Sequence, residues 1–432
     1  MNQQTVKGVI DLVALVLLVI TGVMLLPRFF MWIGGFFPYK KFAETDVLNK
    51  YAILIPARNE SAVIRGILDS LKKQDYPLEL LHIYVVVKEH GDKTIEICKK
   101  YPNITTLVAP LQKCKGDALD EAVRYINTHA LDYDGFLIFD ADNVASPNFV
   151  SKINDAFVAG YDIVKGNQNC KNWDTNWVSA ASAYIFTILN HFQNKFRGAY
   201  NGNITLSGSG MLLSKRVFDG FDGWPFKTLT EDYEISVHGV ANGFRTAFCG
   251  DAEFLDEAPI SYKVVKAQRI RWVKGYLQAN QIYNKQLWRR LFAKNVNNRW
   301  SVFEYLFGVT AIWMIAITML WFMLANLVAG IFLSPWVYTG VYFVRSLGAL
   351  VGYYAFMLMY SLPIMIYEQK RAKLKPFLFA KALLVQPILA IMYPVFYLMA
   401  TFKAEVEWVP TPHVVNLVDE GDGDDEGGEM GG

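Results

Sequence analysis

A long apolar region near the end of the chain limits the possible folds more than any other feature. Residues 303–401 are predominantly apolar, and the main interruptions are Pro335, Arg345 and the charged stretch 368–375. A helix needs about 20 apolar residues to cross the hydrocarbon core of a bilayer, so this region has room for several spans. It is far longer than a helix of a soluble core. We expect most of it to lie in lipid.

A second apolar segment lies at the start of the chain. Between residues 8 and 37 only Asp11 and Arg28 are charged, and this segment is long enough for one span. A signal peptide is the alternative, but residues 1–7 contain one basic residue, and bulky side chains follow Arg28 where a small-residue cleavage site should lie. We therefore expect an N-terminal transmembrane helix within residues 1–38.

The basic residues indicate an orientation. They concentrate in residues 39–299 and again in residues 370–375, and such segments usually face the cytoplasm. Spans near residues 303–333 and 338–366 would then leave and re-enter the cytosol. We expect an integral protein of the plasma membrane with its polar middle segment in the cytosol.

The last apolar segment, residues 377–401, leaves two topologies open. A third span would place the end of the chain outside the cell. Pro387 and Pro394 interrupt this segment, so a re-entrant or interface-lying hairpin is the alternative and would keep the end of the chain in the cytosol.

The polar middle segment has the pattern of an α/β domain. Four short apolar runs predict strands, and they alternate with helix-like segments. The runs are residues 51–55, 83–87, 104–108 and 136–139, and the helical segments are 61–73, 93–100 and 115–127. This alternation predicts a mostly parallel sheet that is covered on both faces and binds ligands at the carboxyl ends of its strands.

Composition argues against several other classes of protein. Lys and Arg together number 42 and Asp and Glu 40, and no basic run interleaved with aromatic residues occurs, so we expect no nucleic-acid partner. The four cysteines lack close pair spacing and the six histidines are scattered, which predicts neither a disulfide framework nor a zinc site. Residues 419–432 are rich in glycine and acid, and we expect them to be disordered.

Asp140 and Asp142 directly follow the predicted strand 136–139. Two carboxylates at a strand end can hold Mg²⁺ or Mn²⁺ against a diphosphate and neutralise charge on a departing nucleotide. The alternative, a solvated acidic pair in a turn, is the commoner origin of such a pattern when it occurs alone.

Thr230, Glu231 and Asp232 follow the glycine-rich segment 206–210, whose small residues allow a ligand to approach the backbone. In a closed pocket Asp232 could deprotonate an attacking hydroxyl. A helix start is the alternative, because threonine followed by two acids suits the first turn of a helix.

Gln268 and Trp272 are four residues apart and would share one face of a helix. That face would offer an amide for sugar hydroxyls and an indole for the apolar face of a sugar ring. An amphipathic helix at the membrane surface is the alternative, as we expect for residues 288–290.

These motifs, in this order and after the opening Ile-Pro-Ala-Arg-Asn-Glu of residues 55–60, resemble those of the family 2 inverting glycosyltransferases. More narrowly, the chain resembles the processive membrane synthases of cellulose, hyaluronan, chitin and mannan. The resemblance covers residues 51 to about 275, and the joint occurrence of Asp-x-Asp, Thr-Glu-Asp and Gln-x-x-Arg-Trp is highly specific. It implies a cytosolic α/β domain of the GT-A type, with a mostly parallel sheet, inserted between transmembrane helices.

The resemblance also implies roles for individual residues. Asp232 would be the catalytic base, and Asp140 and Asp142 would hold Mg²⁺ or Mn²⁺. The nucleotide-sugar would be bound by Ala57, Arg58, Asn59, Glu60, Lys115, Asp140, Gln268, Arg271 and Trp272. The acceptor would be bound by Trp272, Gly208 and Glu231.

Two segments depart from the family pattern or extend it. The aspartate that such enzymes carry after the second strand is missing, and Glu89 or Asp92 would replace it, so the choice between a UDP- and a GDP-sugar stays open. Residues 407–413 resemble the gating loop of cellulose and mannan synthases, which would bring Thr411 and His413 to the donor phosphates.

The resemblance and the apolar pattern together predict the layout of the chain. Its parts are a transmembrane helix (residues 1–38), the cytosolic GT-A domain with interfacial helices (39–299), transmembrane and interface helices (300–402), a gating loop (403–418) and an acidic tail (419–432). The expected activity is a β-glycosyltransferase that polymerises a polysaccharide and translocates it. The alternatives are a single addition to a membrane lipid and, at lower weight, a scaffold or transporter with an inactive domain. The oligomeric state is not predicted.

Overall fold

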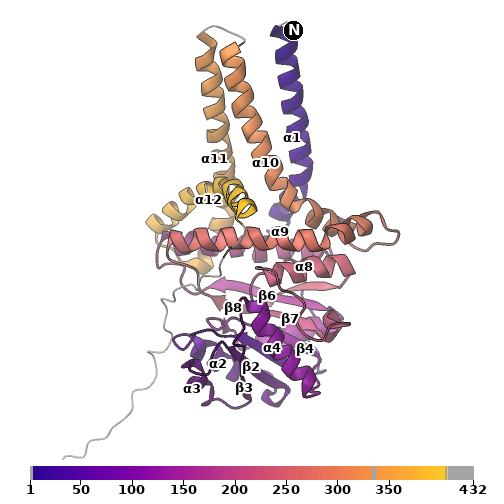
Figure 1. Cartoon of the computed structure of the whole chain (residues 1–432). Helices are drawn as coiled ribbons and strands as arrows, with labels where there is room; N and C mark the ends of the chain where they lie inside the picture. The colour runs from indigo at the N-terminus through magenta and orange to yellow at the C-terminus, as the bar shows by residue number, and fades with distance from the viewer. Residues whose placement is uncertain (1–2, 333–336, 404–405, 407–432) are drawn as a thin grey trace, which may run out of the picture.

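The computed structural model describes residues 3–332, 337–403 and 406 of the 432-residue chain. It consists of a sheet domain at one end and long helices that project from it at the other (Figure 1). The predicted gating loop, with Thr411 and His413, and the acidic tail lie outside the described residues, except for 403 and 406.

The described residues contain an eight-stranded sheet in the order β3-β2-β1-β4-β7-β6-β8-β5. Strands β1 to β4 are mutually parallel, as the sequence predicts, and so are β6 and β8. The second half is mixed, because β7 runs antiparallel to both β4 and β6, and β5 to β8. The strands are β1 Tyr51–Pro56, β2 Leu81–Val87, β3 Ile104–Val108, β4 Gly135–Ile138, β5 Val144–Ala145, β6 Ile163–Cys170, β7 Met211–Ser214 and β8 Thr246–Asp256.

Helices cover both faces of the sheet, which confirms the predicted layering. Alternate residues of β1 point to opposite faces: Ile53 and Ile55 enter one buried core with α2 Ile64–Lys72 and α5 Phe149–Val158, whereas Ala52 and Leu54 enter another with α4 Lys115–Thr128. A short helix, α3 Thr94–Cys98, links β2 to β3. The predicted helices are present but shorter than expected at residues 61–73 and 93–100.

A continuous helical segment connects the sheet domain with the long helices. It consists of α6 Trp177–Phe186, the π-helical η2 Thr187–Asn194 and α7 Lys195–Ala199. Its residues pack against β6 and β8 on one side and against α1 and α12 on the other. Gly34 and Gly35 at the end of α1 allow this contact, because a Cβ at either position would collide with the rings of Phe196 and Phe192.

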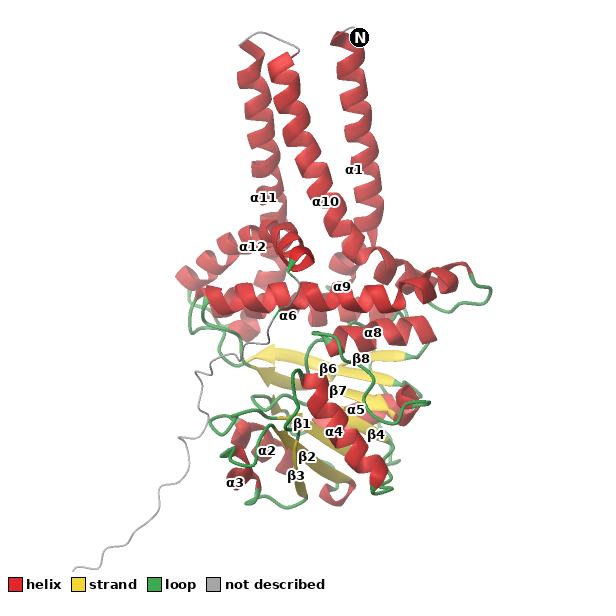
Figure 2. Cartoon of the chain, in the orientation of Figure 1, coloured by secondary structure: helices red, strands yellow, loops and turns green. Residues whose placement is uncertain are grey.

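Three long helices rise side by side from the sheet domain, namely α1 Gln3–Gly34, α10 Arg299–Phe332 and α11 Val337–Ala372 (Figure 1). Both α1 and α11 pack against α10. At their base α1 also meets α11, where the Trp32 indole N–H donates to the Tyr360 carbonyl at 3.0 Å and the two rings stack. Helix α9, Tyr262–Phe292, lies across this base, and α8, Glu231–Asn242, lies between α9 and the sheet (Figure 2).

By length and composition, three helical stretches in the described residues can cross a membrane: Gly8–Gly34, Leu350–Ala372 and Pro376–Phe402. Helix α10 adds a shorter apolar stretch, Met314–Ala325. The last candidate is α12, Pro376–Phe402, which bends across the base of the other helices and contains Pro387 and Pro394 (Figure 1). The segment forms one helix, not a hairpin, and whether it spans a membrane or lies at its interface stays a prediction.

Candidate active site

The carboxyl ends of β1 and β4 open into a cavity of about 270 Å³ that α8, α9 and α12 help to enclose. Most of the residues singled out in the sequence line this cavity although they are distant in the chain. They are Arg58, Glu60, Lys115, Asp140, Asp142, Gly208, Glu231, Asp232, Gln268, Arg271 and Trp272. Motifs that are far apart in the sequence therefore form one site.

Three of the predicted donor-binding residues do not line the cavity. Ala57 is fully buried, and its N–H donates to the Val86 carbonyl at 2.8 Å. Asn59 has a left-handed backbone (φ 59°), and its N–H donates to the Asp92 carboxylate at 2.8 Å. Glu89 is exposed. Asp92 is buried and also accepts the N–H of Thr94, so in this structure it fixes the loop that follows β1.

Asp140 and Asp142 stand in a tight turn after β4. The Asp140 N–H donates to the side chain of Asn143 at 3.1 Å, and the Asn143 amide donates to Asp142 and Asp256 at 3.2 Å each. Lys171 donates to the Asp142 carbonyl at 2.7 Å. These bonds fix the turn while the Asp140 side chain stays about one third exposed to the cavity.

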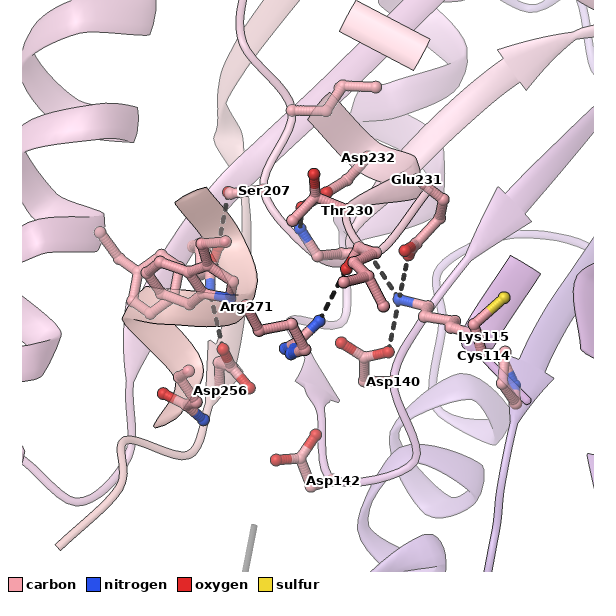
Figure 3. A pocket seen from close by; sticks show the side chains of 18 of the residues that line it. Cys114, Lys115, Asp140, Asp142, Ser207, Thr230, Glu231, Asp232, Asp256 and Arg271 are labelled. Atoms are coloured by element: carbon pink, nitrogen blue, oxygen red, sulfur yellow. Dashed lines mark hydrogen bonds and ion pairs between the residues drawn. The ribbon is translucent and has the colours of Figure 1, made fainter. Parts of the chain in front are cut away.

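Lys115, the first residue of α4, reaches into the centre of the site (Figure 3). Its ammonium lies 2.6 Å from Asp140 and 3.5 Å from Glu231, and it donates to the Gly208 carbonyl at 2.7 Å. Burial opposes the charged form, but the carboxylates of Asp140 and Glu231 outweigh it and raise the pKa of Lys115 above its ordinary value. The lysine is therefore a fixed cation beside the predicted diphosphate site.

Glu231 and Asp232 begin α8, so the helix start that the sequence offered as the alternative is present. Thr230 stands at the cap position, yet its hydroxyl makes no capping bond. Asp232 instead points at the glycine-rich segment, where Oδ2 accepts the N–H of Gly208, and Oδ1 accepts the N–H of Tyr233 at 2.7 Å. Burial raises the pKa of Glu231 to about 7, with Lys115 opposing the shift and Asp232 adding to it.

Gln268, Arg271 and Trp272 reach the cavity from one face of α9, as their spacing predicts. Arg271 donates to the Leu229 carbonyl at 3.0 Å. The Trp272 ring contacts Phe186 of α6 edge to face at 5.6 Å, and the Arg269 guanidinium lies 4.2 Å from its centre. With Tyr276 of α9 and Tyr393 of α12, these rings form an aromatic wall at the side of the cavity that faces the long helices.

Sequence reasoning missed Asp256 at the end of β8, which lies across the cavity from Lys115 (Figure 3). Its carboxylate accepts from Gln168 at 2.6 Å and from the N–H of Glu257 at 2.9 Å. Burial, assisted by Asp140, raises the pKa of Asp256 to about 6. A single acid has no motif of its own, and the available signal was only its position shortly before the Gln-x-x-Arg-Trp motif.

The donor set suits a divalent cation that is held together with phosphate. Asp140 and Asp142 offer oxygen ligands at the cavity, the type that Mg²⁺ and Mn²⁺ prefer. In the described part of the chain no group of three His, Cys, Asp or Glu side chains is arranged to hold a metal. Two carboxylates leave coordination positions of such an ion open to other oxygen ligands, such as water or phosphate.

A sheet of this order, with paired aspartates after the fourth strand and the remaining motifs gathered around them, defines a glycosyltransferase domain of the GT-A type. The family model described as "Glycosyltransferase like family 2" matches residues 49–275, more than half of the chain. The protein belongs to glycosyltransferase family 2.

Relatives and solved structures agree with this assignment. YdaM of Bacillus subtilis, named a probable glycosyltransferase, is 26% identical over 59% of this chain and 63% of its own length. A protein of Arabidopsis thaliana named a probable glucomannan 4-beta-mannosyltransferase is 20% identical over 56% of this chain and 49% of its own. The chain thus spans less than two thirds of the relatives it matches.

The same fold occurs in a solved structure. The mannosyltransferase PcManGT from Pyrobaculum calidifontis, in complex with GDP-Man and Mn²⁺, superposes with a TM-score of 0.58 at 14% identity, over 87% of this chain and 98% of that one. At this identity the likeness concerns the fold.

Proposed function

We propose that this protein is an inverting β-glycosyltransferase that takes sugar from a cytosolic UDP- or GDP-sugar and polymerises it into a polysaccharide that crosses the membrane. The observation that carries the proposal is the single cavity described above. This cavity contains Asp140 and Asp142, which suit a metal ion that binds a diphosphate. It also contains the carboxylate of Asp232 and the aromatic wall next to the long helices.

Donor binding would use the cationic side of the cavity. Lys115 and Arg271 face Asp140 from two sides and suit the two phosphates of a nucleotide-sugar (Figure 3). Arg58, Glu60 and Gln268 line the same cavity, and we assign them to the donor. A Mg²⁺ or Mn²⁺ ion held by Asp140 and Asp142 would neutralise charge on the departing diphosphate. Ala57, Asn59 and Glu89 do not line the cavity. We therefore assign them only an indirect role in donor binding, through the loops that contain them.

Transfer would need one base. The acceptor oxygen attacks the anomeric carbon on the face opposite the diphosphate, its proton passes to Asp232, and the bond to the diphosphate oxygen breaks with its electron pair. Attack from the opposite face inverts the configuration. The Gly208 N–H holds one oxygen of Asp232 in place. We assign Trp272, Gly208 and Glu231 to the acceptor, because all three lie at the cavity.

Addition of one sugar to a membrane lipid is the second candidate, and the base of the helices favours it. The bond from Trp32 to Tyr360 joins α1 to α11 where both meet the sheet domain. A polymer leaving the cavity would have to pass beside α12, whereas a lipid could reach the aromatic wall from the side of α12 that carries exposed apolar residues such as Leu384 and Ile388.

Product size separates the two candidates. The purified protein is incubated with a panel of radiolabelled UDP- and GDP-sugars, with and without membrane lipids, and the products are sized. Long chains support the synthase. A single labelled lipid supports the alternative. Absence of both transfer and donor hydrolysis with every sugar would contradict an enzymatic role.

A further inference from the structure

Residues 203–208 form a buried segment that runs into the glycine-rich residues 206–210 at the catalytic site. This segment belongs to no strand or helix. Backbone polar groups in a buried segment need partners, and here side chains of other elements supply them. The N–H of Ile204 donates to Thr246 at 2.8 Å and that of Leu206 to Ser236 at 2.8 Å. The path of this segment is therefore set by side chains around it.

Helix α10 supplies two of these partners from its first turns. The Asn203 N–H donates to the Ser301 hydroxyl at 2.9 Å. The Tyr305 hydroxyl donates to the Ile204 carbonyl at 2.9 Å and lies 2.7 Å from the Thr205 hydroxyl. Ser301 is fully buried and Tyr305 is nearly so, hence water cannot replace these bonds.

The opposite side of the segment is held by Asn194, which is itself tied to α10. Its amide oxygen accepts the Thr205 N–H at 2.8 Å and its amide nitrogen donates to the Thr205 carbonyl at 2.7 Å. Arg197 donates to the same amide oxygen at 2.9 Å and forms a buried, two-pronged ion pair with Glu304 of α10. Breaking a buried pair of this kind leaves an unpaired charge.

The segment ends on the residues assigned to the chemistry. The Gly208 N–H donates to Asp232, and the Gly208 carbonyl accepts from Lys115. Tyr305 also stacks on Tyr233, the neighbour of Asp232, with ring centres 5.9 Å apart. Two chains of contacts thus connect α10 with Asp232, one through residues 203–208 and one through Tyr233.

We propose that the first turns of α10 form part of the catalytic apparatus, with Tyr305 as a residue that positions the base through residues 203–208. The proposal rests on the proposed role of Asp232. It makes α10 more than an anchor, because the seating of this helix sets the orientation of the carboxylate that takes the acceptor proton.

The test begins with Tyr305→Phe, which removes only the hydroxyl and keeps the ring stacked on Tyr233. Turnover should fall about 10- to 100-fold, as expected when a reacting group is displaced by up to an ångström, and donor affinity should stay unchanged. Thr318→Val is the matched control, because it removes the buried 2.9 Å bond to Thr21 from the same helix far from the segment. That variant should keep the wild-type turnover.

A second pair of variants, at Thr205, separates a positioning role from a folding defect. Thr205→Val removes one of the two partners of the Tyr305 hydroxyl and should lower turnover in the same direction, whereas Thr205→Ser keeps the hydroxyl and should keep the wild-type rate. Tyr305→Phe combined with Asp232→Asn should be no slower than Asp232→Asn alone, since a positioning residue acts only through the base. Near-normal turnover of both Tyr305→Phe and Thr205→Val, or full multiplication of the two losses in the double variant, would overturn the proposal. A fast Asp232→Asn variant would instead refute the assigned base.

Discussion

Asp232 differs from an ordinary helix-start acid in where its oxygens point. One of them accepts a backbone N–H from a segment 24 residues away, at the edge of the cavity. Asp232→Asn keeps the shape and can still accept one of the two backbone N–H groups, from Gly208 or Tyr233, but it removes the basicity. We expect turnover to fall by about 10² to 10⁴-fold, the usual contribution of a general base, with little change in donor affinity.

Initial rates and nucleotide-sugar affinity of the purified variant measure this, and a melting curve controls for folding. If Asp232 only stabilises the start of α8, asparagine serves nearly as well there. Retention of more than about a tenth of the wild-type rate, well above the loss expected for a base, would place Asp232 among the structural residues.

Lys115 predicts a coupling between metal and nucleotide. Its ammonium lies 2.6 Å from Asp140, a predicted metal ligand, so a cation arriving alone meets a like charge. A donor diphosphate would attract the lysine and leave Asp140 to the metal. Lys115→Met should therefore tighten Mn²⁺ binding in the absence of nucleotide by about tenfold or more, since one unit charge at this range is worth on the order of 1–4 kcal/mol.

Titration of Mn²⁺ followed by electron paramagnetic resonance, with and without UDP or GDP, gives both affinities. Lys227→Met is the matched control, because Lys227 pairs with Asp117 and Asp120 of the same α4 outside the cavity. Unchanged or weaker metal binding by Lys115→Met would contradict the coupling. Full turnover in excess chelator would contradict the metal requirement itself.

At the scale of elements, the turn before β7 depends on one glycine. Gly210 has a φ of +61°, and a Cβ there would lie 2.1 Å from the Phe254 ring of β8. Its N–H and carbonyl also link the Ile138 carbonyl to the Gly166 N–H, between β4 and β6. Gly210→Ala should cost about 2–5 kcal/mol of stability, from the left-handed backbone and overpacking together.

Gly220→Ala provides the comparison, because Gly220 has a φ of +86° with nothing within 4 Å of its Cβ position. It should lose only the backbone part, about 1–2 kcal/mol. Melting temperatures of both variants test the difference. Equal melting temperatures would show that the contact with Phe254 relaxes freely.

The two halves of the sheet differ in how far the sequence predicts them. Strands β1 to β4 are apolar runs between helices, and their parallel arrangement follows from that alternation. Strand β5 has two residues, and β6 carries the buried polar residues Lys165, Asn167 and Gln168, of which Gln168 lines the cavity. No apolar run marks such strands. Gln168, for example, is stabilised by hydrogen bonds with Asp256 and Ser207, which only the tertiary structure brings next to it.

The site shows the same division. Motif residues were found because each motif is local in sequence, and the cavity joins them. Asp256 was missed because a single acid at a strand end has no local signature. The π-helical η2 could likewise not be predicted from the spacing of apolar residues. Its residues make bonds to other segments, such as that from Asn194 to Thr205.

At the scale of the whole molecule, the cavity is lined by residues that follow β1 and β4 and by residues of α9 and α12. Helices α9 and α12 lie at the base of α1, α10 and α11 (Figure 1). The donor residues come from the sheet side and the aromatic wall from α6, α9 and α12. Under the proposed function, a water-soluble donor would approach past β1 and β4, and a membrane-associated acceptor would approach beneath α12. The proposed function would require the sheet domain and the turn between α11 and α12 to share one side of the membrane.

That requirement gives a topology prediction that depends on no enzymatic assay. Lys373 is exposed in the turn between α11 and α12, and lysines and arginines in such turns usually face the cytosol. Thr5 is exposed near the start of α1, at the far end of that helix from the sheet domain (Figure 1). In intact cells, a membrane-impermeant thiol reagent should label Thr5→Cys and leave Lys373→Cys unlabelled. After the membrane is opened, Lys373→Cys should become labelled as well. Labelling of Lys373→Cys in intact cells would place the turn outside and refute a cytosolic donor site.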